Sequence, residues 1–147
     1  MYKINKIKEI YGVPLTSSPA AIDTISTHFN DRGIDADYYD LVVTGDLGKL
    51  GHSITKEQLL NMGLDFKERY IDCGMEIFDL ERQDVHAGGS GCGCCATVFA
   101  GYLYNMIKTK KINRFLLVAT GALMSTTSAF QGESIPGIAH AVAIERV

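Results

Sequence analysis

The sequence predicts a single α/β domain, in which a mixed sheet ends in an antiparallel strand and a helix is buried at the centre. Three short apolar runs, residues 39–44, 114–120 and 138–144, have the length and the β-branched content of buried strands. A helical pattern without a polar face covers residues 95–107. The last two strands are joined without a predicted helix, which allows them to pair as a long antiparallel hairpin.

Length and composition are those of one soluble globular domain. The 147 residues are enough for a sizeable core, and the formal net charge of −3 offers no basic surface for nucleic acid or for an anionic membrane. No apolar run approaches the roughly 20 residues that span a bilayer, and the N-terminus lacks the apolar centre of a signal peptide. Three of the four cysteines lie too close together for a disulfide framework. We therefore expect an intracellular protein with reduced cysteines.

The N-terminal part of the chain contains two helical patterns. Residues 2–11 show a weak pattern, which Gly12 and Pro14 end. A second helix is predicted to begin in residues 16–19, a capping sequence with proline in the first turn, and to run to about Asn30.

The first predicted strand, residues 39–44, leads directly into a glycine-rich turn. Open α/β sheets place ligand sites at the carboxyl ends of such strands, so Gly45 and Asp46 are candidate binding residues. A plain strand-to-helix turn explains the same glycines, and spacing alone favours that interpretation. Beyond the turn, a capping-box pattern predicts a helix over residues 56–62.

The remaining connections are less regular. Within the aperiodic segment 63–83, residues 70–78 are predicted to form an extended or partly helical connection. Residues 121–132 are predicted to be a polar loop without a helix. The third strand, residues 138–144, carries no charge on either face, and we therefore expect it to be buried.

The central stretch, residues 84–104, begins as a glycine-rich loop and continues as a helix. The small loop residues are Gly88, Gly89, Ser90, Gly91 and Gly93. Their lack of bulk lets another segment or an anion approach the backbone amides. The following helix carries apolar side chains in every direction, so it is expected to be buried on all sides.

One histidine and three cysteines lie close together in this stretch: His86, Cys92, Cys94 and Cys95. Structural zinc sites use two separated cysteine pairs. Adjacent cysteines that enter one helix cannot all point at a single ion, so we expect no metal.

Cys92 is a candidate nucleophile, because a thiolate near a helix N-terminus is stabilised, and His86 is a candidate base. The alternative is that Cys92, Cys94 and Cys95 are small apolar residues suited to close helix packing. Packing is favoured, since a reactive cysteine is exposed whereas this helix is predicted to be buried.

Anion binding is the third possibility for the central stretch. The amides of residues 88–91 and the hydroxyl of Ser90 are suited to a carboxylate or a phosphate. The loop is not a P-loop, because it lacks the Gly-Lys-Ser/Thr ending, and it does not match the dinucleotide-binding G-x-G-x-x-G motif.

Four segments resemble, in order, the stage V sporulation protein AD family of endospore-forming bacteria: DYYDLVVTGDLGKLG, DVHAGGSGCGC, LLVATGALMS and QGESIPGIAHAVAIE. The resemblance runs from about residue 19 to the C-terminus and covers only the second half of such a protein. It implies a thiolase-like domain over residues 19–147, an incomplete half of a two-half fold, and leaves residues 1–18 unassigned.

A thiolase-like half has a five-stranded sheet of order 3-2-1-4-5, and two halves enclose a pair of buried helices. The resemblance implies that residues 39–44, 114–120 and 138–144 are the third, fourth and fifth strands, and that the apolar helix is one of the central pair. The first two strands have no clear counterpart in the sequence, and the first half is absent.

The resemblance also implies a scaffold without condensing chemistry. In condensing enzymes of this fold a histidine follows the third strand, where Gly45 and Asp46 stand here, and an asparagine or histidine stands in place of residues 87–89. The resemblance therefore implies no catalytic residue and no cofactor.

The family is associated with uptake of dipicolinic acid, pyridine-2,6-dicarboxylate, into the forespore, as the soluble partner of channel proteins at the spore inner membrane. We expect a non-enzymatic binding protein for this aromatic dicarboxylate, with a missing first half or a second copy as a further partner. The candidate binding residues are Gly45, Asp46, His86, Gly88, Gly89, Ser90 and Gly91. The alternatives are a thiolase-like acyltransferase that uses Cys92 and His86, and a remnant without a site of its own.

Overall fold

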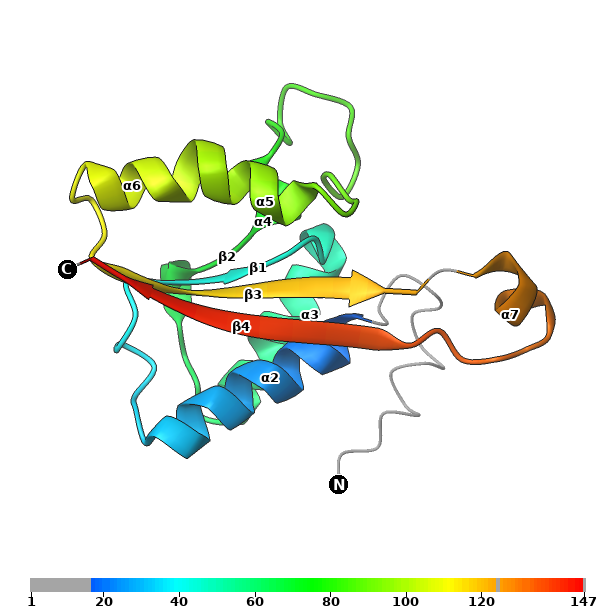
Figure 1. Ribbon diagram of the computed structural model, residues 1–147, viewed down its shortest axis with the longest axis horizontal. Helices are drawn as coiled ribbons and strands as arrows, with labels where there is room; N and C mark the ends of the chain where they lie inside the picture. The colour runs from blue at the N-terminus through cyan, green and yellow to red at the C-terminus, as the bar shows by residue number, and fades with distance from the viewer. Residues whose placement is uncertain (1–16, 124, 147) are drawn as a thin grey trace.

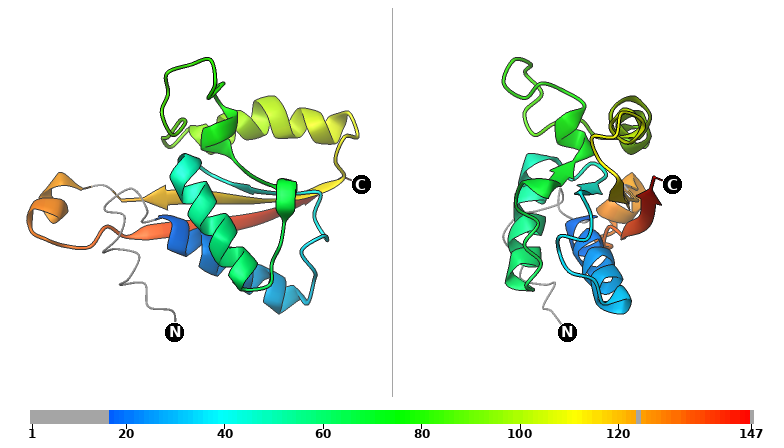
Figure 2. Two further views of the ribbon diagram at one scale, coloured as in Figure 1. Left: turned by 180° about the vertical axis from the view of Figure 1, so that it is seen from behind. Right: turned by 90° about the vertical axis from the view of Figure 1, so that its left-hand side faces the viewer.

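The structure, a computed structural model, describes residues 17–123 and 125–146, and the helix predicted over residues 2–11 lies outside this part. The described residues form three layers, with helices on both faces of one sheet (Figures 1 and 2). Two long helices cover one face: α2 (Ser17–Arg32) and α3 (Gly48–Asn61). One continuous helical run covers the other: α5 (Cys94–Val98), the π-helical turn η3 (Phe99–Leu103) and α6 (Tyr104–Lys108).

The sheet has four strands in the order β2-β1-β3-β4. Their bounds are β1 (Leu41–Thr44), β2 (Tyr70–Asp72), β3 (Arg114–Ala122) and β4 (Gly137–Glu145). β1 pairs in parallel with β2 and with β3, whereas β3 and β4 are antiparallel. The predicted mixed α/β fold with an antiparallel last strand is confirmed.

Residues 70–78, predicted to be an extended or partly helical connection, begin with strand β2, which the sequence pattern does not identify as a strand of the sheet. A 3-10 turn, η2 (Lys67–Arg69), leads into it, and the short helix α4 (Cys73–Glu76) follows at once. Three residues are too few to show the alternation that marks a strand. Because β2 occupies the edge of the sheet, β1 is an interior strand, and the assignment of residues 39–44 to the third, edge position of a thiolase-like half is wrong.

Helix α3 begins at Gly48, not at residue 56 as the capping-box pattern predicts. Thr55 lies inside the helix and is fully buried, so it is not a cap. Gly48 has a φ of 66°, which turns the chain from β1 into the helix. The amide of Lys49 donates to the carbonyl of Ala87 at 2.8 Å. A partner this distant in the chain is invisible to a local capping pattern.

Two apolar cores lie on the two faces of the sheet. The first core, under α2 and α3, contains Ile25, Phe29, Leu59, Leu116 and Val118 among its buried residues. The second core, under the helical run 94–108, contains Val43, Cys94, Val98, Leu103 and Phe115. Burial of large apolar side chains on both faces is the main source of stability for this sheet.

The helical run 94–108 is buried on one side only. Val98 and Leu103 belong to the second core, whereas Tyr102 and Tyr104 are 45% and 54% exposed. The prediction of burial on every side is wrong for this chain by itself. An apolar pattern on every side predicts that each side is covered, but it does not identify what covers it.

Strand β4, the second edge strand of the sheet, is likewise exposed on one of its two faces. Ala139 and Ala141 pack against the first core, whereas Ile138 and Val142 are each 55% exposed. The prediction that this strand is buried on both faces is therefore wrong.

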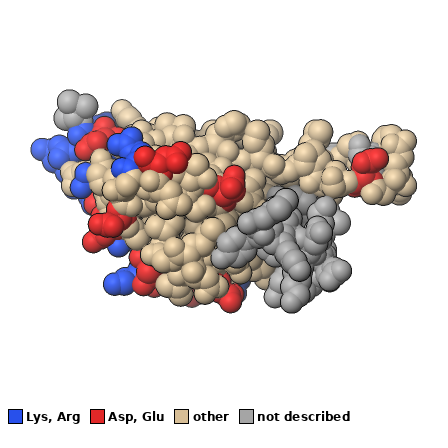
Figure 3. Space-filling view, turned by 90° about the horizontal axis from the view of Figure 1, so that it is seen from below, with Lys and Arg blue, Asp and Glu red and all other residues tan. Residues whose placement is uncertain are grey.

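Strands β3 and β4 continue beyond the rest of the sheet as a two-stranded arm (Figure 1). The sequence predicts their pairing, but the connection contains a short helix, α7 (Thr126–Phe130), where a loop without a helix is predicted. In the view of Figure 3, Lys and Arg side chains gather mainly at the end of the molecule away from this arm. No helix in the described part of the chain combines the length and apolarity needed to cross a bilayer.

Candidate functional site

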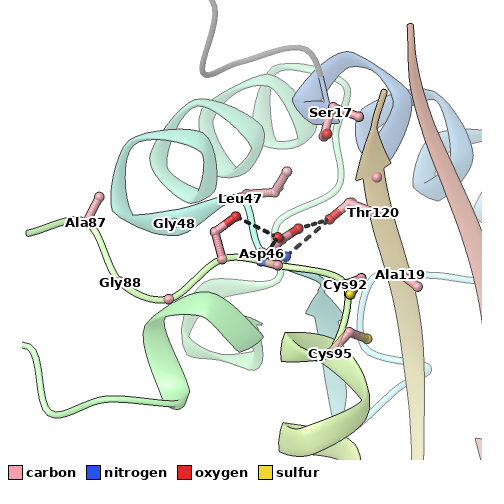
Figure 4. Close-up of a pocket in the computed structure, with 15 residues that line it drawn as sticks. Ser17, Asp46, Leu47, Gly48, Ala87, Gly88, Cys92, Cys95, Ala119 and Thr120 are labelled. Carbon is pink, nitrogen blue, oxygen red and sulfur yellow. Dashed lines mark hydrogen bonds between the residues drawn. The ribbon is translucent and has the colours of Figure 1, made fainter. Parts of the chain in front are cut away.

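A pocket of about 680 Å³ lies at the carboxyl ends of β1 and β3 (Figure 4). Its walls are residues 46–48 after β1, the glycine loop (residues 87–92), residues 119–122 of β3, and the single residues Ser17 and Cys95. Parallel strands bring their carboxyl ends to the same edge of a sheet. The pocket thus joins the two glycine-rich segments that the sequence singles out.

Asp46 is the residue that ties the pocket walls together. Its Oδ2 accepts hydrogen bonds from Ser90 Oγ and from the amide of Gly91, both at 2.9 Å. Its Oδ1 accepts from Thr120 Oγ1 at 3.1 Å, and its own amide donates to the same hydroxyl at 3.1 Å. One carboxylate therefore links the end of β1, the glycine loop and the end of β3 (Figure 4).

A second carboxylate, that of Asp72, supports the pocket from behind. It is fully buried and accepts from the amides of Leu47, Gly48 and Gly74, each at 3.0 Å. The hydroxyl of Thr44 donates to it at 2.7 Å. Four donors satisfy a charge that burial would otherwise make very costly, and they hold the start of α3 against the end of β2.

The amides of the glycine loop are largely engaged within the protein. Gly88 N donates to Val85 O at 2.9 Å, Gly89 N to Gly74 O at 2.7 Å, and Gly91 N to Asp46. Three of the four amides predicted to hold an anion thus already have acceptors. The structure differs here from the open cradle that the sequence predicts, because two backbone carbonyls and Asp46 already accept from these amides.

Two glycines of the loop are required by close approach to α4. A Cβ at Gly88, whose φ is 115°, would lie 2.2 Å from the carbonyl oxygen of Gly74, and a Cβ at Gly89 would lie 2.6 Å from Ile77 Cγ2. Gly45 has a similar packing role, since its Cβ would lie 2.5 Å from Thr120 Oγ1. Unlike Asp46, Gly45 is not among the residues that line the pocket.

His86 does not line the pocket. Its side chain is 90% exposed, and its Nδ1 lies 3.7 Å from Asp84 Oδ1. The glycine loop turns the histidine outward at a φ of 50°. The structure therefore does not bring His86 together with the other predicted binding residues, nor into the pocket that Cys92 lines.

The four cysteines differ in environment. Cys92 is exposed and lines the pocket, as does the half-buried Cys95. Cys94 is buried with its Sγ 4.0 Å from Gly45 O, and burial raises the pKa of its thiol to about 11. Cys73 is fully buried. The interpretation of these thiols as packing residues thus fits Cys94 and does not fit Cys92.

Interaction between the side chains of Cys73 and Cys95 raises the pKa of the buried Cys73 thiol and lowers the pKa of Cys95. Within residues 17–123 and 125–146, no group of three or more His, Cys, Asp or Glu side chains is arranged to hold a metal ion.

The sequence does not identify several residues of the site, above all Asp72 and Thr120. A usable signal for Thr120 exists, because the first two predicted strands both end in Thr-Gly, at residues 44–45 and 120–121. Asp72 has a weaker signal, a carboxylate that caps α4 by accepting from Gly74 N. Neither pattern shows that both side chains converge on one turn.

Two comparisons with known proteins agree with each other. The family model for stage V sporulation protein AD matches residues 7–145. Stage V sporulation protein AD of Bacillus subtilis (strain 168) is 46% identical over 129 residues, which cover 88% of this chain and 38% of that protein. The chain therefore spans well under half the length of the curated relative that it matches.

Proposed function

Because the chain belongs to the stage V sporulation protein AD family, we propose that it is a non-catalytic binding protein that holds dipicolinic acid during its uptake into the forespore, together with a membrane channel. The observation that carries this proposal is the pocket at the carboxyl ends of β1 and β3. Its hydroxyl and amide donors converge on one carboxylate, that of Asp46.

The size and lining of the pocket suit a small aromatic dicarboxylate. Pockets for small molecules commonly measure about 300 to 1,000 Å³ and combine apolar walls with a few polar groups. Here Ala87, Ala119 and Ala122 provide apolar wall, while Ser90 and Thr120 provide hydroxyls. The alanines suit the aromatic ring of the ligand, and the hydroxyls suit its carboxylates.

Binding requires an exchange of anions. Asp46 holds Ser90 Oγ, Gly91 N and Thr120 Oγ1 in the described structure. A ligand carboxylate that takes these donors displaces the Asp46 carboxylate toward water, and no donor is left without an acceptor. The loop residues Ser90 and Gly91 are exposed, so this rearrangement does not open the core.

An acyltransferase is the second candidate, favoured by one observation: Cys92 is exposed and lines the pocket. The position of His86 argues against it, because the side chain predicted to act as base is 90% exposed and lies outside the pocket. Incubation with acetyl-coenzyme A followed by intact mass measurement separates the two functions. An acetyl group on Cys92 would favour the enzyme, and an unmodified chain would favour binding.

The exposed side of the helical run 94–108 supports a proposal of a macromolecular partner. Ala100, Gly101 and Tyr104 are exposed there, and small residues let another helix approach closely. We propose that a thiolase-like first half, corresponding to sequence of the longer relative that this chain does not span, covers this face. A second copy of the chain is the other possible occupant of this face. Light scattering after size exclusion tests it, because a stable dimer would favour a second copy over the first half.

Calorimetry with dipicolinate tests the binding function on the 147-residue chain. We expect a saturable heat with dipicolinate and a much weaker one with picolinate, which keeps the ring nitrogen and has one carboxylate fewer. Thr120→Val, which removes a hydroxyl at constant shape, should weaken binding about tenfold, the effect of one lost hydrogen bond to a charged group. Absence of heat at millimolar dipicolinate would contradict the proposal.

A further inference from the structure

Two thiols line the pocket at the start of the helical run 94–108. Cys92 and Cys95 both line the pocket, and Figure 4 shows both on the same side of the pocket floor. Cys92 is exposed, whereas Cys95 is half-buried. Neither thiol takes part in the proposed binding of dipicolinate.

The backbone between these cysteines is a helical turn. The amide of Cys94 donates to Gly91 O at 3.0 Å, and the amide of Thr97 donates to Gly93 O at 2.9 Å. Gly93 has helical dihedral angles, with φ −93° and ψ −11°. Residues three apart in such a turn lie on one face, with Cβ atoms about 5–6 Å apart.

Closing a disulfide across this turn requires a small approach of the two Cβ atoms, to about 4 Å. The flanking glycines allow it. Gly91 has a φ of 132°, and the Cβ positions of Gly91 and Gly93 meet no atom within 4 Å. The segment that carries Cys92 thus has both conformational freedom and space.

The other two cysteines are placed differently. Cys94 points away from the pocket toward Gly45 O, and its raised pKa, about 11, keeps it a thiol near neutral pH. Cys73 is fully buried, out of reach of a solute. Its interaction with Cys95 lowers the pKa of Cys95 and raises that of Cys73, so Cys95 is the thiol of that pair that ionises first.

We propose that Cys92 and Cys95 form a reversible dithiol–disulfide site that exchanges with small organic disulfides entering the pocket. The exposed Cys92 thiolate attacks one sulfur of the incoming disulfide, whose S–S bond breaks and releases one thiolate. The Cys95 thiolate then attacks Cys92 Sγ in the mixed disulfide and expels the second thiolate. The two departing thiolates take up the two protons that the cysteines lose, so two protein thiols are oxidised and one small disulfide is reduced to two thiols.

The consequence for the pocket follows from chain connectivity. The amide of Gly91, next to Cys92, donates to Asp46 Oδ2. A Cys92–Cys95 bond ties residue 92 to the helix and so restrains the glycine loop at the point where Asp46 holds it. The oxidation state of the pair therefore sets the mobility of one pocket wall.

The test uses the reduced 147-residue chain incubated with glutathione disulfide, then denatured and alkylated with N-ethylmaleimide for intact mass measurement. Of the four cysteines, we expect two to be alkylated, with no glutathione retained. Cys95→Ser should retain one glutathione on Cys92, because the resolving thiol is gone. Cys94→Ser, the matched control in the same turn, should still form the internal disulfide, with one thiol alkylated and no glutathione retained.

Two results would overturn the proposal. One is an unsubstituted chain that keeps four alkylatable thiols or retains glutathione. The other is an internal disulfide that still forms in Cys92→Ser, which would assign the bond to Cys73 and Cys95. Cys92 is exposed, so this variant is expected to fold, and a circular dichroism spectrum checks that it does. Neither result bears on dipicolinate binding, which calorimetry measures separately.

Discussion

Asp46 and Asp72 stand at the carboxyl ends of neighbouring parallel strands, yet their surroundings differ. Asp72 is fully buried and accepts from four donors in the strand ends, the start of α3 and the start of α4. Asp46 lines the pocket, and two of its donors belong to the exposed residues Ser90 and Gly91. The difference teaches that Asp72 fixes the sheet edge, whereas Asp46 holds an exposed loop against the pocket.

The largest expected effect comes from Asp72→Asn, which places an amide group where four donors converge. We predict a loss of about 3 kcal/mol in the free energy of unfolding, because buried donors lose a charged acceptor. Urea denaturation measures it. Asp79→Asn is the matched control, since Asp79 accepts from two backbone amides in an exposed turn. Equal losses in the two variants would remove the distinction drawn for Asp72.

Gly88→Ala should be the next most damaging change. The added Cβ would lie 2.2 Å from Gly74 O on a backbone with a φ of 115°, so the glycine loop must move away from α4. We expect a loss of about 2 kcal/mol. Gly93→Ala is its control, because a Cβ there meets nothing within 4 Å. A Gly88→Ala chain as stable as Gly93→Ala would show that the loop is not held against α4.

Asp46→Asn should cost only about 1 kcal/mol, because the hydrogen bonds it weakens are partly or fully exposed. Its effect is expected to be local, with faster amide hydrogen exchange at Gly91 and unchanged exchange in β3. A loss as large as that of Asp72→Asn would mean that Asp46 is also a structural residue and that the pocket does not open cheaply.

The smallest predicted effect is on the pH dependence of stability and comes from His28. This residue belongs to α2, on the face of the sheet opposite the second core. Burial, and then the charge of Arg32, lowers the pKa of His28 below its ordinary value of 6.5, and its Nε2 lies 2.8 Å from Tyr39 Oη. A lowered pKa favours the neutral form in the folded state. Its contribution is therefore present above about pH 6.5 and is lost as the pH falls through that value toward the folded pKa.

The measurement is the urea midpoint at about pH 7.5 and at about pH 5.5. His28→Gln should reduce the drop between the two. A drop that survives in His28→Gln would assign the titration to another group.

Much of the sheet follows from the sequence, because β1, β3 and β4 are long enough to show apolar runs. The glycine-rich segments also identify the edge at which the pocket lies. What escapes prediction depends on contacts distant in the chain. β2 is only three residues long, and α3 begins at Gly48 because Asp72 and Ala87, far along the chain, accept its first amides.

Local sequence patterns also misjudge how deeply side chains are buried. The apolar residues of β4 and of the helical run 94–108 predict contact on every side, but Val142 and Tyr104 are more than half exposed in this chain. An apolar pattern predicts that a side chain is covered, but it does not identify the surface that covers it. The site shows the same limit, since three of the four loop amides that the sequence predicts to be open for a ligand already donate to Val85 O, Gly74 O and Asp46.

Amide-resolved NMR titration of the ¹⁵N-labelled chain with dipicolinate tests the central claim most directly. The account predicts saturable shift changes in residues 88–91 and 120–122, with little change in residues 33–40 at the far end of the sheet, and a weaker response in Thr120→Val. Spectra that stay unchanged, or changes that gather away from the pocket, would contradict it.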